Sequence, residues 1–276
     1  MTPVRVLDLV PVGAYHLLTL AAAGIAATAR PGQFVAVAVG GPDTAMLLRR
    51  AFALYRADRS TGEVQVVFAV HGRGTAWLAG VSPGQRLDVL GPLGRPFTLP
   101  EQPGPAVLVA GGYGSAPMFD LARELRAGGS DVHLALGAGS ADRLFGVDEA
   151  RQVADSVTVR TEDGSAGGRG LVTDGLAGHL TGAGAVYACG PMGLLRAVAQ
   201  LAAGAGVPAQ VAVEESMACG IGVCMTCVLP VVGDDGRSRL VRSCVEGPVF
   251  GADRIRWADV GTMPADLVGA DAMGGH

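Results

Sequence analysis

The stretch AGGYGSAPMFDLARELRA, residues 110–127, decides the fold of the middle of this chain. It follows an apolar, strand-like run, and Gly111, Gly112 and Gly114 allow the backbone to turn sharply and to approach a ligand closely. The pattern departs from GxGxxG, because Pro117 stands where the third glycine would be. Four apolar residues then share one face of a predicted helix: Met118, Leu121, Ala122 and Leu125. Amides at the start of this helix suit a phosphate, although a plain strand-to-helix connection has the same pattern.

The same strand, turn and helix pattern extends over residues 102–211. The apolar runs AVLVAG, VHLALGA, VTVRTE, AVYACG and AQVAVE alternate with segments of helical period. Such alternation predicts an α/β domain with a parallel sheet, of the type that binds nucleotides. A second glycine turn, VYACGPMGLLRAV, puts Cys189 at the carboxyl end of a strand, where open sheets bind ligands. A buried small hydrophobe is the simpler interpretation of this cysteine, and both stay open.

Residues 1–101 differ from the middle of the chain. They hold no convincing long helix, and short strand-like runs are separated by Gly and Pro turns, which predicts a small antiparallel β-barrel or sandwich. The five expected strands are HLLTL, GQFVAVAV, RRAFALYR, GEVQVVFAV and GQRLDVLG. Two of its segments, LRRAFALYR (48–56) and HGRGTAWL (71–78), carry arginines and a glycine-rich turn that are compatible with phosphate. A solvated arginine or a simple loop explains each of them equally well when it is taken alone.

Residues 212–262 contain four of the five cysteines. Their spacing is CxxxxC, then CxxC, then sixteen residues to the last one, which is typical of a plant-type [2Fe–2S] cluster. The predicted metal ligands are Cys219, Cys224, Cys227 and Cys244. A zinc site more often pairs two CxxC knuckles, and a secreted disulfide framework is denser in cysteine. We therefore expect a cluster to stabilise this small third domain, and we expect residues 263–276 to form a mobile tail.

Composition excludes several classes of function. The formal net charge is −4, and all 21 basic residues are arginine, so there is no broad positive field for nucleic acid or anionic lipid. The longest apolar stretch is too short to span a bilayer, and the N-terminus lacks the pattern of a signal peptide. We therefore expect a globular cytoplasmic protein.

Taken together, the motifs resemble the ferredoxin–NADP reductase superfamily. This resemblance rests on five sequence motifs: RRAFAL, GRGT, GPLGRPF, GGYGSAPMFDLA and ACGPMGLLRAV. The C-terminal words EESMACGIGVCMTCVLPV and RSCVEGPVF narrow it to the family of electron-transfer subunits of dihydroorotate dehydrogenase type B, over about residues 3–258.

The resemblance implies two cofactor sites in addition to the cluster. The residues implied for FAD are Arg50, Ala51, Phe52, Ala53, Val67, Phe68, Ala69, Gly74 and Thr75. Those implied for NAD are Gly112, Gly114, Cys189, Gly190, Pro191 and Met192. Two positions depart from the family, because Ala53 stands where Ser or Thr is usual and Ala69 where an arginine is common.

The resemblance also implies the function. A partner subunit that contains FMN would oxidise dihydroorotate, and electrons would pass through the cluster and FAD to NAD⁺ in pyrimidine biosynthesis, within a heterotetramer. No acid–base catalytic residue is assigned, because the cofactors carry the chemistry. Two alternatives stay open: a flavin and iron–sulfur reductase subunit for another acceptor, of oxygenase or hydrogenase type, and a zinc-stabilised interaction module. The choice between NAD and NADP is open too.

Overall fold

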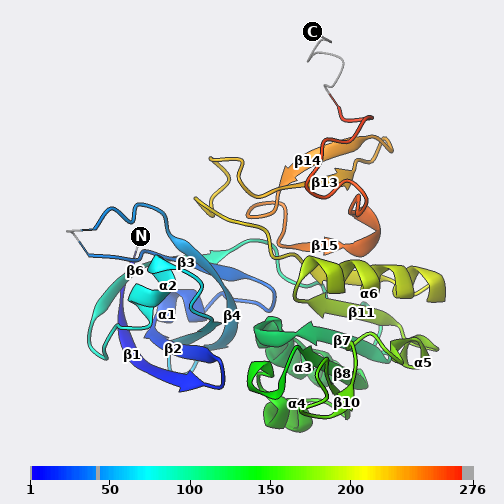
Figure 1. Cartoon of the computed structure of the whole chain (residues 1–276), viewed down its shortest axis with the longest axis horizontal. Coiled ribbons are helices and arrows are strands. Elements are labelled where there is room, and N and C mark those ends of the chain that lie inside the picture. The colour runs from blue at the N-terminus through cyan, green and yellow to red at the C-terminus, as the bar shows by residue number, and fades with distance from the viewer. Residues whose placement is uncertain (1, 42–43, 269–276) are drawn as a thin grey trace.

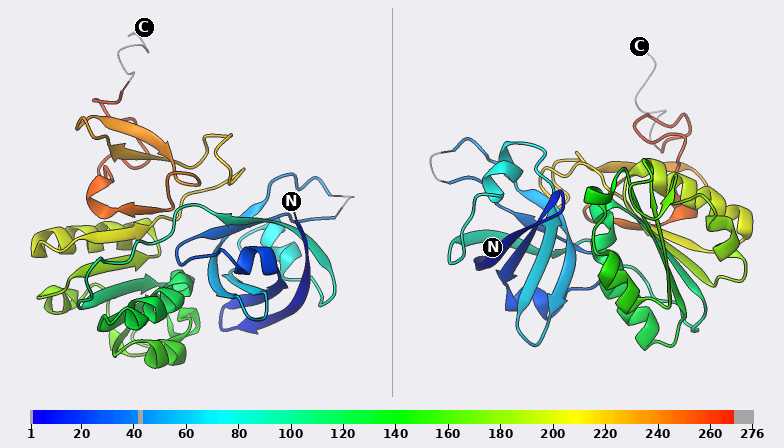
Figure 2. Two further views of the ribbon diagram at one scale, coloured as in Figure 1. Left: turned by 180° about the vertical axis from the view of Figure 1, so that it is seen from behind. Right: turned by 60° about the horizontal axis from the view of Figure 1, so that its bottom comes forward.

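The computed structural model describes residues 2–41 and 44–268 of the chain, and it has three parts (Figure 1). A β-barrel lies beside an α/β sheet, and a smaller part carrying β13 and β14 sits on top of the sheet. The views from behind and from below show the same arrangement, with the cysteine-bearing loop reaching from the third part toward the barrel (Figure 2). The multidomain architecture predicted from the sequence is confirmed.

The first part is a closed antiparallel barrel with the strand order β1-β2-β5-β4-β3-β6. Its elements are β1 (Thr2–Val12), β2 (Tyr15–Ala21), α1 (Ala23–Ala26), β3 (Phe34–Val37), β4 (Arg50–Asp58), β5 (Glu63–Phe68), α2 (Arg73–Leu78) and β6 (Arg86–Leu93). Closure pairs every strand on both sides, so the barrel leaves no open edge. Strand β1 was not predicted from the sequence, although its buried Val4 and Val6 alternate with an exposed Arg5.

The second part is built on a mostly parallel sheet with the order β10-β9-β8-β7-β11-β12-β15. Its elements are β7 (Ala106–Gly111), α3 (Ala116–Ala127), β8 (Val132–Ala138), α4 (Val147–Val153), β9 (Ser156–Thr161), β10 (Gly168–Arg169), α5 (Leu176–Leu180), β11 (Ala185–Cys189), α6 (Met192–Ala205) and β12 (Ala209–Ala212), with 3₁₀ turns at Gly112–Ser115 and Ala141–Arg143. Alternate residues of each strand face opposite sides, so α3 packs on one face and α5 and α6 on the other.

The strand order reverses direction at β7. The chain moves outward through β8 and β9 on one side of β7, then returns to β11 and β12 on its other side. Loops that leave the carboxyl ends of β7 and β11 therefore diverge and open a crevice, which is where open α/β sheets bind their ligands. Both glycine turns singled out in the sequence lie at this place.

The third part is a two-stranded hairpin of β13 (Val228–Val232) and β14 (Ser238–Arg242), followed by β15 (Val249–Gly251) and a 3₁₀ turn at Ala252–Arg254. The third part is tied to the second, because β15 pairs antiparallel with β12 and extends the parallel sheet. This pairing was not predicted, since a three-residue strand carries too little pattern to reveal its partner.

Part of the expected tail is packed against the hairpin. The backbone N–H of Val268 donates to the carbonyl of Ser238 at 2.9 Å, and the Ser238 hydroxyl donates to Asp266 at 2.5 Å. Leu267 is buried. The remainder of the tail, residues 269–276, lies outside the described residues.

Candidate functional site: a cavity joined to a cysteine loop

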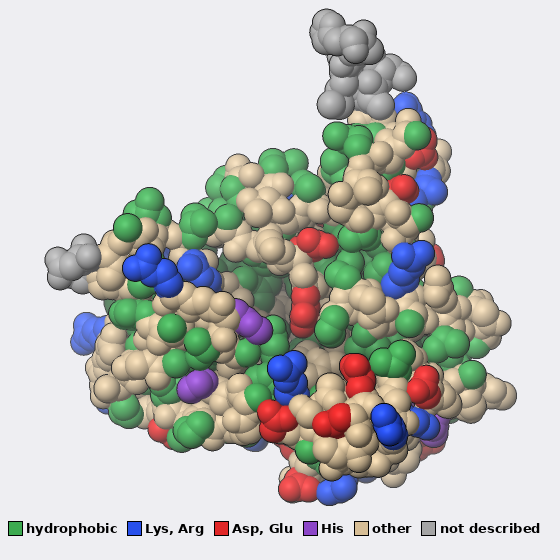
Figure 3. Space-filling view, viewed as in Figure 1, with side chains coloured by type: hydrophobic (Ala, Val, Ile, Leu, Met, Phe, Trp, Pro, Cys, Tyr) green, Lys and Arg blue, Asp and Glu red, His purple; other side chains and the backbone are tan. Residues whose placement is uncertain are grey.

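A cavity of about 360 Å³ lies between the barrel and the sheet, below the third part of the chain. Figure 3 shows this face of the molecule as a hollow between the two larger parts. One wall comes from β4 and β5 of the barrel. The opposite wall comes from the turn after β7 and from the segment after β12, residues 212–217.

Ten of the residues predicted to bind flavin or nucleotide line this cavity: Arg50, Ala51, Phe52, Ala53, Val67, Phe68, Ala69, Thr75, Gly114 and Cys189. The structure thus brings together segments that are up to 139 positions apart in the sequence, from Arg50 to Cys189. The other five predicted residues are not part of the lining: Gly74, Gly112, Gly190, Pro191 and Met192.

Arg50 and Gly74 are in direct contact at one end of the cavity. A Cβ atom at Gly74 would lie 2.7 Å from Nε of Arg50, so glycine is required for the guanidinium to lie against the start of α2. Nη1 of Arg50 donates to the carbonyl of Leu48 at 2.7 Å, which fixes the direction of the side chain. The Thr75 hydroxyl accepts from the backbone N–H of His71 at 2.9 Å and from that of Gly72 at 3.2 Å. These contacts build a polar, cationic end on an otherwise apolar cavity.

The two glycine turns of the sheet touch each other. A Cβ atom at Gly114 would lie 2.9 Å from the carbonyl oxygen of Cys189 and 2.9 Å from the Cα of Gly190. The two turns can approach this closely only because both positions lack a side chain. Gly190, Pro191 and Met192 therefore form the support behind the cavity wall, while Cys189 and Gly114 face the cavity itself.

Cys189 is a buried thiol, and the exposed Glu214 lies near it. Burial raises the pKa of Cys189 well above the usual value, and Glu214 raises it further. Desolvation also raises the pKa of Glu214. The wall at Cys189 therefore favours the neutral thiol, which suits a weakly polar ligand.

Several cavity residues were not predicted from the sequence. His71, Tyr113 and Glu214 line the wall, and so do Glu215, Ser216 and Met217. Burial is the main reason that the pKa of Tyr113 rises to about 12, and its ring packs edge-on against Tyr15 with 5.3 Å between centroids. One signal could have revealed the acidic pair, because it follows the last parallel strand, at the ligand-binding edge of the sheet.

The four cysteines of the third part lie close to the cavity. Cys227 and Cys244 are buried, and they pack with Phe34, which also lines the cavity. Cys219 is half-buried and Cys224 is exposed. The inner thiols therefore meet the barrel, while the outer ones are more accessible to solvent.

The loop that carries the outer cysteines curves around them. Gly220, Gly222 and Met225 adopt positive φ values of 72°, 82° and 60°. The sulfur of Cys219 accepts the backbone N–H groups of Ile221 and Val223, each at 3.4 Å. Burial raises the pKa of Cys219, but these amides outweigh it and hold the pKa at about 6. A loop of this form stabilises a thiolate, which is the state that binds iron.

Arg242 holds the loop to the hairpin. Its Nη1 donates to the carbonyl of Gly222 at 2.8 Å, and its Nη2 donates to Glu246 at 3.0 Å. A Cβ atom at Gly222 would lie 2.5 Å from Val245, so the loop passes tightly over the hairpin end at this point.

The four thiols influence one another. Cys219 interacts with Cys224, and Cys244 interacts with Cys227 and with Cys219. Within residues 2–41 and 44–268, no three Cys, His, Asp or Glu side chains surround a point that could hold one metal ion. Four cysteines with this spacing are the ligands that a plant-type [2Fe–2S] cluster uses. The donor set therefore fits the cluster.

A closed antiparallel barrel, a nucleotide-type sheet and a four-thiol loop together define a flavin- and iron–sulfur-dependent oxidoreductase of the ferredoxin reductase type. The comparisons with known proteins make this more specific. Residues 214–256 match the family model described as the iron-sulfur cluster binding domain of dihydroorotate dehydrogenase B.

Curated relatives match over most of their length. An electron transfer subunit of dihydroorotate dehydrogenase B (NAD(+)) from Desulforamulus reducens is 35% identical over 84% of this chain and 89% of that protein. The corresponding subunit from Geobacillus kaustophilus is 37% identical over 86% of this chain and 91% of that protein. The chain belongs to the family of dihydroorotate dehydrogenase B electron transfer subunits.

Solved structures agree on the fold. A chain of an NADH-dependent reduced ferredoxin-NADP oxidoreductase has a TM-score of 0.82 and 28% identity, over 94% of this chain and 92% of that one. The ferredoxin reductase of carbazole 1,9a-dioxygenase has a TM-score of 0.64 at 20% identity, over 75% of this chain and 66% of that one, which shows the fold alone. FAD, a [2Fe–2S] cluster and NAD are the cofactors of this kind of protein.

Proposed function

We propose that this chain is the subunit that passes electrons to NAD⁺ in a complex that oxidises dihydroorotate, a step of pyrimidine biosynthesis. The relatives that carry this name match 87 to 91% of their own length, so the likeness covers all three parts of the chain. The membership of the family and the four-thiol loop both support the proposal.

One observation carries the proposal. The segment after β12 lines the cavity as far as Met217, and Cys219 follows two residues later. Phe34 makes a second connection, because it lines the cavity and packs against Cys227 and Cys244. A redox group in the cavity and a cluster on the thiols would therefore be separated by little more than one layer of side chains.

The roles of the individual residues follow from their places. Arg50, with the amide turn around Gly74 and Thr75, would bind the phosphates of FAD, and the apolar strand residues of β4 and β5 would hold its ring system. Gly114 and Cys189 would face the nicotinamide, and the four cysteines would hold the cluster. When bound, FAD supplies the exchange between hydride transfer to nicotinamide and single-electron transfer to the cluster.

The two departures from the family pattern fall on the cavity wall. Ala53 and Ala69 both line it, and neither has a side-chain donor to offer a flavin. The backbone of β4 and β5, and Arg50 at the cavity end, would supply the polar contacts instead.

The partner subunit would dock over the cysteine loop. Apolar side chains are exposed there, with Val223 at 73%, Met225 at 53% and Ile221 at 49%. Figure 3 shows hydrophobic side chains gathered above the hollow, on the side of this loop. Exposed apolar groups beside a redox centre are typical of an interface. We propose that the partner contains FMN, that two copies of each subunit form a heterotetramer, and that the complex works in the cytoplasm, where cysteines stay reduced.

No helix among the described residues is both long and apolar enough to cross a membrane. The longest, α6, has 14 residues.

The test uses the purified chain loaded with FAD and a [2Fe–2S] cluster. We expect it to oxidise NADH with an artificial dye as acceptor, and to leave dihydroorotate unchanged until an FMN-containing catalytic subunit is added. Oxidation of dihydroorotate by the chain alone would contradict the proposal. A colourless, zinc-containing protein would favour an interaction module instead, and restoration only by an oxygenase or hydrogenase partner would favour another acceptor.

A further inference from the structure

A second cavity of the molecule is a separate, open groove. It measures about 1030 Å³ and lies where the barrel, the sheet and the third part meet. It shares no lining residue with the cavity of about 360 Å³ described above. The two cavities come close to each other at one point of the chain, because Pro248 lines the smaller one and Val249 lines the groove.

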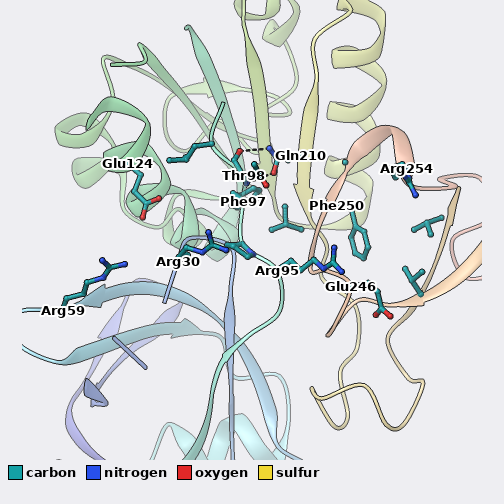
Figure 4. Close-up of a pocket in the computed structure, with 16 residues that line it drawn as sticks. Arg30, Arg59, Arg95, Phe97, Thr98, Glu124, Gln210, Glu246, Phe250 and Arg254 are labelled. Atoms are coloured by element: carbon teal, nitrogen blue, oxygen red, sulfur yellow. Dashed lines mark hydrogen bonds between the residues drawn. The ribbon is translucent and has the colours of Figure 1, made fainter. Parts of the chain in front are cut away.

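Four arginines from four different segments line the groove (Figure 4). Arg30 precedes β3, Arg59 lies in the turn between β4 and β5, Arg95 lies in the linker after β6, and Arg254 lies in the turn after β15. Within the described residues, no hydrogen bond or ion pair is seen for the guanidinium groups of Arg30, Arg59 and Arg95. Arg254 is paired with the exposed Asp234 at 3.1 Å.

Two carboxylates also face the groove. One oxygen of Glu246 accepts from Arg242 at 3.0 Å, so this carboxylate already has a cationic partner. Glu124 offsets part of the positive charge: burial is the main reason that its pKa is raised, and attraction to Arg59 and Arg30 lowers that pKa. One carboxylate remains against the three arginines Arg30, Arg59 and Arg95. The groove is therefore locally cationic in a chain with a formal net charge of −4.

The floor of the groove is rigid. Thr98 and Gln210 form two reciprocal hydrogen bonds, from the Thr98 N–H to the Gln210 side chain at 2.9 Å and from that side chain to the Thr98 carbonyl at 2.8 Å. The backbone N–H of Arg95 donates to the carbonyl of Gly247 at 2.6 Å. These bonds fix the linker to β12 and to the third part. None of them uses the Arg95 side chain, so replacing that side chain should leave the backbone of the linker in place.

We propose that this groove binds an anion with several phosphate groups, either free polyphosphate or the phosphate chain of a nucleotide. Guanidinium groups bind phosphate oxygens with paired, charge-assisted hydrogen bonds, and arginines from separate segments can surround a chain of phosphates. A concave site of this volume suits a small ligand, since pockets of about 300–1000 Å³ hold molecules of that size. The site goes beyond the proposed electron transfer and does not depend on it.

The test measures binding by calorimetry on the chain loaded with FAD and cluster. Saturating NAD⁺ is present, so that the nucleotide-binding crevice is occupied. Inorganic triphosphate and ATP are titrated separately. We expect one molecule to bind per chain, and the double variant Arg30→Gln/Arg95→Gln to weaken the binding at least about tenfold, as loss of charged hydrogen bonds implies. Equal affinity for both probes indicates free polyphosphate, and tighter binding of ATP indicates a nucleotide.

The matched control is Arg5→Gln/Arg86→Gln. These exposed arginines face each other across β1 and β6, so the control removes the same charge from another surface. We expect it to bind both probes like the wild type. Equal weakening in the control would show only a general charge effect and would overturn the proposal.

Three other results would also overturn it. The first is that neither probe gives heat. The second is that ATP alone binds and that the groove variant binds ATP as tightly as the wild type. The third is that neither anion binds and the groove variant weakens docking of the catalytic subunit, which would make the groove a protein interface. Dye-linked NADH oxidation should be the same in the groove variant and the wild type. The proposal of anion binding in the groove can therefore be wrong while the proposed electron transfer is right, and the electron-transfer proposal can be wrong while the groove binds anions.

Discussion

The small cavity and the cysteine loop are neighbours, but different forces hold them in shape. The cavity walls are strands and turns that rest on the two large cores, and Val66 and Leu108 in these cores are fully buried. The loop has no regular strand or helix between β12 and β13, and Val223 at its tip is 73% exposed. The cavity is thus organised by packing, whereas the loop has to be organised by whatever its thiols bind.

From this difference we infer which part of the structure each cofactor stabilises. We expect loss of a flavin to leave the cores of the barrel and sheet intact. We expect loss of the cluster to leave the loop between β12 and β13 held by few contacts, such as that of Arg242 with Gly222. The predictions below test this contrast, from the largest expected effect to the smallest.

Substitution Cys244→Ser should have the largest effect. We expect the iron content to fall below about a tenth of the wild-type value, because a missing ligand removes the binding free energy that orders the loop. FAD should stay bound. Iron analysis and the visible spectrum measure both. Cys189→Ser is the control, and it should retain its iron. A Cys244→Ser protein with full iron content would break the contrast.

Substitution Arg50→Gln should weaken the binding of FAD and leave the iron content unchanged. Loss of one charged hydrogen bond costs about 1.5–3 kcal/mol, which corresponds to about ten- to a hundredfold in affinity. Quenching of flavin fluorescence during a titration of the apoprotein measures it. Arg56→Gln, on the same strand but outside the cavity lining, should bind FAD normally. Equal losses in both variants would show that the cavity end has no special role.

Substitution Tyr55→Phe should have a moderate effect on the packed region. The Tyr55 hydroxyl donates to Glu149 across the contact between barrel and sheet, and its ring packs edge-on against Phe145 with 5.2 Å between centroids. Phenylalanine keeps the ring, and Arg123 still pairs with Glu149, so we expect a loss of about 1 kcal/mol in the free energy of unfolding.

Urea unfolding followed by circular dichroism measures this loss. Tyr55→Ala also removes the ring and should lose about 3 kcal/mol or more. A Tyr55→Phe protein as unstable as Tyr55→Ala would mean that the hydrogen bond, and not packing, holds this contact.

The smallest expected effect is a pH dependence of the free energy of unfolding that originates in a histidine of the parallel sheet. His133 stacks on His179 with 3.7 Å between ring centroids, and burial, followed by this neighbour, lowers its pKa to about 4. A lowered pKa in the folded state contributes stability above the ordinary value of about 6.5, and that stability is lost as the pH falls toward 4. Because the ring is partly exposed, we expect about 1 kcal/mol.

The measurement is the free energy of unfolding in urea at pH 7 and at pH 5. His133→Gln should reduce the difference between the two values, and the wild type should show little further change between pH 7 and pH 8 from this group. The effect should persist when the cluster is removed by a chelator. A pH dependence that disappears with the cluster would place its origin in the loop and not in the sheet.

The sequence predicted most of the local structure of both regions. The alternation of apolar runs with segments of helical period identified the parallel sheet, and the helical face from Met118 to Leu125 is fully buried as expected. The five expected barrel strands are all present, and β1 was missed because Asp8 and Pro11 interrupt its pattern. The placement of the predicted site residues in one cavity supports their roles, which stay predictions until they are tested.

Some features could be read only from the tertiary structure. These are the wall formed by Glu214 to Met217, the contact of Phe34 with the inner thiols, the pairing of β15 with β12, and the arginine groove. Each joins segments that lie far apart in the sequence, and none has a short motif of its own.

The physical reason is one of range. Cysteine spacing, glycine turns and helical periodicity depend on backbone geometry over a few residues, so the amino-acid sequence determined by itself that this chain has a cluster loop and a nucleotide-type sheet. Contacts between distant segments depend on how whole layers bury their apolar faces against one another. Only the folded chain decided that the cysteine loop ends beside the cavity, and that four scattered arginines face a single groove.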